Sequence, residues 1–126
     1  MSEKSSHLQT VGEALELLRS NFPDLISCAD TYEGAPEPYY SYERFAEKIL
    51  QRKSDPDLLN RVCLFIDDMT ESRSNLIREL LVVSILEALA QDALMAKNIR
   101  GHVSPTAADL LRLVERRVYG RQTIEE

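Results

Sequence analysis

The carboxylates of Asp67, Asp68 and Glu71 come closest to a chemical site in both residue type and spacing. On a helix, separations of three and four residues place Glu71 beside both aspartates. Carboxylate oxygens in such a cluster can bind a divalent cation and so support nucleotide hydrolysis. An enzyme of this kind needs a second acidic pair, which Glu43 and Glu47 could supply, and basic side chains that grip phosphate. That basic group is not apparent, so we predict a solvated helix face or part of a binding surface.

Other catalytic and cofactor signatures are absent from the sequence. His7 and His102 are its only histidines, and neither belongs to an HExxH motif or a Cys/His cluster. Cys63 falls among apolar residues and is expected in the core. Cys28 has acidic neighbours, which raise a thiol pKa and disfavour an activated nucleophile. We therefore predict no catalytic residue, no metal site and no cofactor.

An acidic, tyrosine-rich stretch gives the strongest indication of function, and that function is binding. Residues 24–43 hold five acidic residues, four of the five tyrosines and no Lys or Arg. Gly34, Pro36 and Pro38 prevent a continuous helix, so we expect a long loop. Tyrosine offers a large contact area at low entropic cost, and carboxylates steer basic partners. The residues predicted to contact a protein partner are Tyr32, Glu33, Glu37, Tyr39, Tyr40, Asp67, Asp68 and Glu71.

The alternative for this stretch is an ordinary surface connection whose tyrosines pack back onto the helices. For Tyr42, which lies on the apolar face of the next helix, partner contact and packing onto the helices are equally supported. For Tyr32, Tyr39 and Tyr40 we favour partner contact. The carboxylates are expected to raise association rate and specificity more than affinity.

Apolar spacing predicts an all-α fold, a single-domain irregular bundle of about five helices, and no strand. Thr10 and Glu13 form a capping box for the first helix, whereas Asp55 and Ser104 each precede a proline that starts a helix. Residues 1–126 are expected to form one domain with frayed ends at 1–7 and 121–126. The expected helices begin near residues 10, 41, 55, 75 and 104.

The fourth predicted helix, residues 75–98, is expected to be central because its middle is apolar nearly all round. Glu87 interrupts this apolar run, and a buried carboxylate must be paired or hydrogen-bonded. It therefore either pairs with an arginine of the last helix or is partly exposed at a groove. A homodimer that buries part of this helix is an open alternative.

Composition narrows the class of partner. The 126-residue chain has a net charge of −6, and residues 1–71 hold 14 of its 21 acidic residues. This charge argues against direct nucleic-acid binding, which needs a basic face, but not against a basic protein partner. Two isolated cysteines, a polar N-terminus and no apolar run long enough to span a bilayer predict a cytoplasmic protein that does not enter the membrane.

The pattern of residues 42–118 resembles the small helical immunity proteins that bacteria encode beside polymorphic or contact-delivered toxins. The resemblance rests on the apolar helix at residues 79–90, a short loop, and the final helix that begins at Ser104 and Pro105 and continues with Asp109-Leu-Leu-Arg-Leu-Val-Glu115. It also rests on small size and acidic character. The resemblance implies a tight complex that blocks or distorts the active site of a toxin, and it carries no site residue with it.

The hypothesis we favour is a toxin-neutralising immunity protein that is not an enzyme. Its acidic, tyrosine-rich surface would occlude a basic cleft in an effector that acts on nucleic acid or a nucleotide. Glu33, Glu37 and the carboxylates of residues 67–71 would mimic phosphates, with Tyr39 and Tyr40 as anchors. The first alternative is an adaptor or secretion chaperone that binds an effector segment in a groove beside the central helix. The second is a metal-dependent nucleotide hydrolase.

Overall fold

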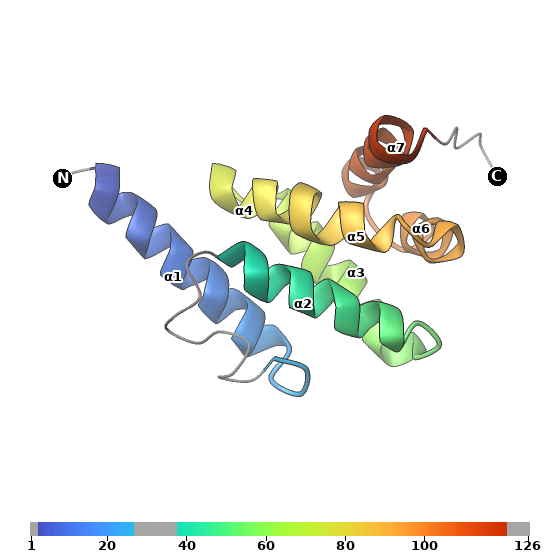
Figure 1. The fold of residues 1–126 in the computed structure, drawn as a ribbon, viewed down its shortest axis with the longest axis horizontal. Coiled ribbons are helices and arrows are strands. Elements are labelled where there is room, and N and C mark those ends of the chain that lie inside the picture. The colour runs from blue at the N-terminus through green and yellow to red at the C-terminus, as the bar shows by residue number, and fades with distance from the viewer. Residues whose placement is uncertain (1–2, 27–37, 121–126) are drawn as a thin grey trace.

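The structure, a computed structural model, describes residues 3–26 and 38–120, which form six helices and no strand (Figure 1). The predicted all-α class is confirmed. No helix in these two ranges is long and apolar enough to cross a bilayer. The helices are α1 (Glu3–Asn21), α2 (Pro38–Gln51), α3 (Pro56–Thr70), a continuous helix made of α4 (Asn75–Leu80), η1 (Leu81–Leu86) and α5 (Glu87–Leu89), then α6 (Ala93–Arg100) and α7 (Pro105–Tyr119).

The predicted start signals of α3 and α7 are confirmed in atomic detail. The Asp55 side chain accepts a hydrogen bond from the backbone N–H of Leu58 at 3.1 Å, and Pro56 follows at the first helical position. The Ser104 hydroxyl accepts from the N–H of Ala107 at 3.2 Å. Each cap satisfies a donor that the helix itself leaves unbonded. Gly120 then ends α7 with a φ of 65°, a left-handed conformation that glycine adopts without steric cost.

Two predicted helix starts are wrong. The first helix begins at Glu3, so Thr10 lies inside α1 and its capping-box pattern starts nothing. Residues 3–9 contain no glycine or proline, so nothing in the chain stops the helix from continuing back past Thr10. The second helix begins at Pro38 rather than Ser41, because proline already has a helical φ and lacks the N–H that a first turn leaves unbonded.

The single helix predicted for residues 75–98 is also wrong, because the chain turns at Ala90–Asp92. Asp92 has an extended backbone, and its side chain accepts from the N–H of Met95 at 3.0 Å, which starts α6 as a new helix. Lys53 of the α2–α3 connection pairs with Asp92 at 2.9 Å and holds it in place. The helix before the turn contains a π-helical segment, in which the Glu87 N–H donates to the carbonyl of Val82.

The aromatic part of the core lies between α1, α2 and α3. Phe22, Phe45 and Phe65 contact one another with ring centroids 4.5 to 5.7 Å apart, and all three side chains are buried. Arg61 of α3 lies over the Phe22 ring and donates to the Asp24 carboxylate at 2.8 Å, which ties the end of α1 to α3. This ion pair holds the pKa of Asp24 below its usual value.

The helix formed by α4, η1 and α5 occupies the centre of the bundle, as predicted. Figure 1 shows α1 at one end, α6 and α7 at the other, and α2 running beside the central helix. The inward residues of the central helix are completely buried, including Leu81, Ile85 and Leu89. Val83, in the same helix, is 44% exposed. The central helix therefore packs on several sides and still presents one strip at the surface.

Candidate functional site

The acidic, tyrosine-rich stretch is only partly within the described residues. Tyr32, Glu33 and Glu37 lie outside them. The prediction that Tyr39 and Tyr40 lie in a loop is wrong. Both lie on the first turn of α2. A helix holds these two side chains in different directions, about 100° apart around its axis.

The three described tyrosines of this stretch have different surroundings. Tyr39 is half-buried, packs against the core and donates its hydroxyl to the Glu79 carboxylate of α4. Tyr40 is 41% exposed. Tyr42 is fully buried, and its hydroxyl donates to the Ala14 carbonyl of α1 at 2.6 Å. Burial raises the pKa of Tyr42 above its usual value. Of the three, Tyr40 therefore offers the greatest surface to a partner.

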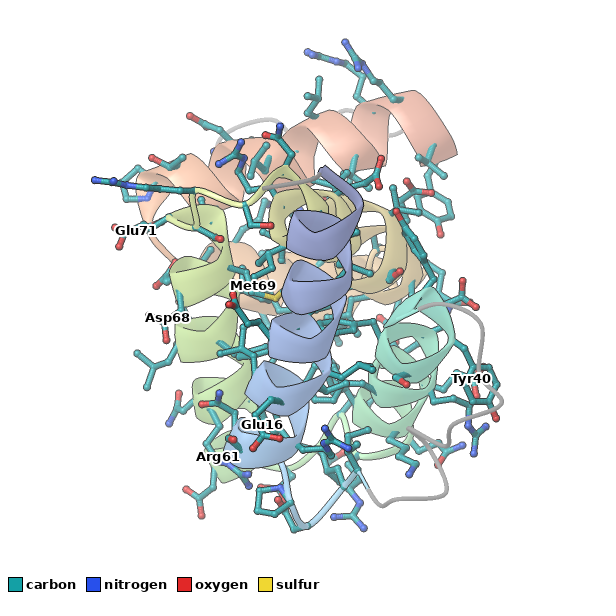
Figure 2. All side chains as sticks on the ribbon, turned by 90° about the vertical axis from the view of Figure 1, so that its left-hand side faces the viewer. Glu16, Tyr40, Arg61, Asp68, Met69 and Glu71 are labelled. Atoms are coloured by element: carbon teal, nitrogen blue, oxygen red, sulfur yellow. The ribbon has the colours of Figure 1, made fainter. Side chains whose placement is uncertain are left out.

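The three carboxylates of α3 also differ. Asp67 is half-buried, and its Oδ1 accepts from the Ser104 N–H at 2.8 Å, at the start of α7. This contact joins α3 to α7 and compensates the helix dipole. Asp68 and Glu71 are exposed and project on the opposite side of the molecule from Tyr40 (Figure 2). The structure does not bring the predicted residues of α3 and α2 onto one surface. Among the described residues, no three His, Cys, Asp or Glu side chains are grouped to hold a metal ion.

A different acidic surface extends along α2 and the central helix. We call it the acidic face. It consists of Tyr40, Glu43 and Glu47 of α2 with Glu79, Val83 and Glu87 of the central helix. Spacings of three or four residues place each set along one side of its helix, and α2 packs directly against η1 and α5. The regular spacing of the glutamates was the available sequence signal, but the pairing of these two helices was not.

The glutamates of the acidic face differ in how they are compensated. Glu47 pairs with Arg44 at 2.9 Å. The Glu79 carboxylate accepts a hydrogen bond from the hydroxyl of Tyr39. Glu43 and Glu87 have no ion-pair or hydrogen-bond partner for their carboxylates within residues 3–26 and 38–120. Two carboxylates without a cationic partner in the described part of the chain thus lie on neighbouring helices.

An open groove of about 310 Å³ lies within the acidic face. It is lined by Glu43, Glu47, Val83, Ser84, Glu87, Ala88, Gln91 and Tyr119. The Tyr119 hydroxyl donates to the Glu87 carbonyl at 2.6 Å, so the end of α7 closes one side of the groove. Ser84 is 0% exposed, and its Oγ has no hydrogen-bond partner in the described chain.

Glu87 thus follows the second of its two predicted alternatives, partial exposure at a groove. Among the residues whose burial the structure describes, the buried carboxylate is instead that of Glu115 of α7, which is 1% exposed and pairs with Arg100. Cys63 is buried in the core as predicted, and burial together with the Asp67 carboxylate raises its pKa to about 11. Cys28 lies outside the described residues.

Most of the chain matches one protein family. Residues 15–116 match a family described as "Domain of unknown function (DUF7674)". The chain belongs to this family. The match begins inside α1 and ends inside α7, so it includes both helices that carry the acidic face. No curated protein and no solved structure matches the chain.

Proposed function

We propose that the protein is a cytoplasmic immunity protein that binds and neutralises a cognate bacterial toxin. The observation that supports this most is the acidic face, where Glu43 and Glu87 lack a cation among the described residues and lie beside exposed apolar and aromatic side chains. Carboxylates held on packed helices attract a basic partner and disfavour an acidic one. A toxin that acts on nucleic acid or a nucleotide needs a basic cleft, which matches this charge.

The proposed mechanism is occlusion of that cleft. Glutamates of the acidic face would occupy the positions of substrate phosphates, and Tyr40 would pack against the wall of the cleft. Tyr32, Glu33 and Glu37 directly precede α2 in the sequence and remain predicted contacts of the same surface. Asp68 and Glu71 face away from Tyr40 (Figure 2), so we treat them as a separate patch that a compact partner would not reach at the same time.

The groove favours a second candidate, an adaptor that binds an effector segment beside the central helix. Val83 is 44% exposed at the groove, and Ala88 also contributes to its lining. Burial of an apolar segment there would give a complex that resists high salt, whereas attraction by carboxylates weakens as salt screens charge. The salt dependence of binding therefore separates the two candidates.

The test is co-expression of the tagged protein with the product of the neighbouring gene, followed by capture at low and at high salt. The proposal expects a stoichiometric partner that stops cell growth when expressed alone and is harmless in the complex. It also expects capture to weaken at high salt. A captured partner that is not toxic, or whose toxicity the protein leaves unchanged, would contradict the immunity function.

Three pairs of charge reversals locate the contact. Glu43→Lys with Glu47→Lys is expected to slow association roughly tenfold or more at low salt. Glu33→Lys with Glu37→Lys tests the predicted residues outside the described ranges. Asp68→Lys with Glu71→Lys is the matched control on α3. If the α3 pair weakens capture and neutralisation more than the α2 pair does, the acidic face is not the contact surface.

A further inference from the structure

We propose that the groove of the acidic face binds a single arginine side chain of the partner protein. This inference rests on the proposed function and specifies its central contact. It starts from the groove lining, where three glutamates from two helices and the buried residue Ser84 border the same open space. Arg44 pairs with Glu47 at 2.9 Å. Glu43 and Glu87 remain available to an incoming cation.

The Ser84 hydroxyl is an independent indication of a ligand. A buried polar group without a hydrogen bond is rare in folded proteins, because its desolvation is not offset. A serine inside a helix usually donates to a carbonyl of the preceding turn. Ser84 lies in the π-helical segment, is 0% exposed, and makes no such bond in the described chain. Ser84 is one of the residues that line the groove, where its hydroxyl would accept a hydrogen bond from the bound ligand.

The remaining lining favours arginine over lysine. The exposed part of Tyr119 offers an aromatic surface for a planar guanidinium, and Val83 offers an apolar contact for its methylene stem. Five N–H donors spread in a plane can reach two carboxylates and the Ser84 hydroxyl together, whereas an ammonium group has three donors and is more strongly hydrated. Arginine is also the charged residue most enriched at the centres of protein interfaces.

The direct test is a titration of the folded chain, labelled with ¹⁵N, with acetyl-arginine amide, followed through its amide resonances. Acetyl-citrulline amide is the matched neutral control, and acetyl-lysine amide tests the preference for guanidinium. We expect saturable shifts at Val83, Ser84, Glu87 and Gln91 with arginine, weaker ones with lysine and none with citrulline. An equal response to citrulline would assign the groove to a neutral segment. Shifts spread equally over Asp68 and Glu71 would indicate charge attraction without a site. Either result overturns the proposal.

Two variants test the residues that carry the inference. Glu87→Gln is expected to weaken arginine amide binding about tenfold, and Ser84→Ala to weaken it by a smaller factor. Glu71→Gln, an exposed change on α3, is the control and is expected to leave binding unchanged. Unchanged binding by both groove variants, with the fold verified by amide dispersion, would overturn the proposal. Broadening of the groove resonances with protein concentration alone would assign the groove to a second copy of the chain and would also overturn it.

The outcomes separate this inference from the proposed function. If the toxin is captured and neutralised equally by wild type, Glu87→Gln and Ser84→Ala, the immunity function stands and the arginine site falls. If arginine amide binds in the groove but no toxic partner is found, the site stands and the proposed function falls.

Discussion

Arg100 of α6 and Glu115 of α7 form an ion pair that is almost completely removed from water, with side chains 6% and 2% exposed. The pair joins two helices that follow the turn at Ala90–Asp92. Removing two charges from water is costly, and their attraction offsets that cost only while both are present. The packing of α6 against α7 therefore depends on keeping both partners.

Glu115→Leu is expected to lower the free energy of unfolding by about 3–5 kcal/mol, because it leaves the Arg100 guanidinium buried without its carboxylate. The double change Arg100→Met with Glu115→Leu is expected to recover most of this loss, because no buried charge remains. Urea unfolding followed by circular dichroism measures both values. Asp109→Asn is the control, since the Asp109 side chain is 78% exposed and pairs with Arg112 at the surface. A double variant no more stable than Glu115→Leu alone would argue against an isolated buried charge as the cause.

Asp67 and Asp68 are adjacent in sequence but are predicted to differ in their effect on stability. Asp67→Ala removes the acceptor for the Ser104 N–H and a negative charge at the start of α7, so we expect a loss of about 1–3 kcal/mol. Asp68→Ala changes an exposed side chain and is expected to shift stability by less than about 0.5 kcal/mol. Thermal unfolding of the two variants checks the difference. Equal effects would show that the Asp67 contact with α7 does not stabilise the fold.

The hydroxyl of Tyr42 is predicted to stabilise the contact between α1 and α2. Tyr42→Phe keeps the buried ring but removes the donor to the Ala14 carbonyl, for an expected loss of about 1–2 kcal/mol. Tyr40→Phe is the matched control two residues away, and because Tyr40 is 41% exposed, little change is expected. Urea midpoints of the two variants provide the measurement. The prediction fails if Tyr42→Phe is as stable as wild type.

Cys63 is predicted to make stability fall in alkaline solution. Its pKa is raised to about 11 in the folded chain from an ordinary value of 9.0. The folded state therefore holds the thiol proton more tightly, so the stabilisation is fully present below pH 9 and is lost as pH rises through 11. The expected loss is roughly 2–3 kcal/mol.

The measurement for this thiol is the difference in unfolding free energy between wild type and Cys63→Ala across this pH range. All other ionisable groups are the same in both proteins, so their contributions cancel in the difference. The advantage of wild type over Cys63→Ala is expected to shrink as the pH rises. A difference that stays constant from pH 8 to pH 11 would rule out this assignment.

Local signals were enough to predict the helical class, the caps and much of the core. Asp55 with Pro56, and Ser104 with Pro105, act within a single helical turn, so their effect can be recognised without knowledge of the fold. The burial of Cys63 followed from its apolar neighbours, and the central position of the fourth helix from apolar residues on every side. Part of the candidate site followed as well, since Tyr40 is a predicted partner contact and the glutamates of α2 are visible in the sequence.

The positions of charged and aromatic side chains relative to other helices were decided only by tertiary structure. Tyr39 contacts Glu79, and Lys53 holds Asp92 at the turn that breaks the predicted long helix, although about 40 residues separate each pair. The groove needs α2, the central helix and the end of α7 together. The spacing of residues along a helix determines the side on which each residue lies. Which residues of other helices lie next to it depends on how the helices pack. The acidic sequence could therefore indicate a binding protein, while only packing could bring Ser84 and three glutamates of two helices to the same groove.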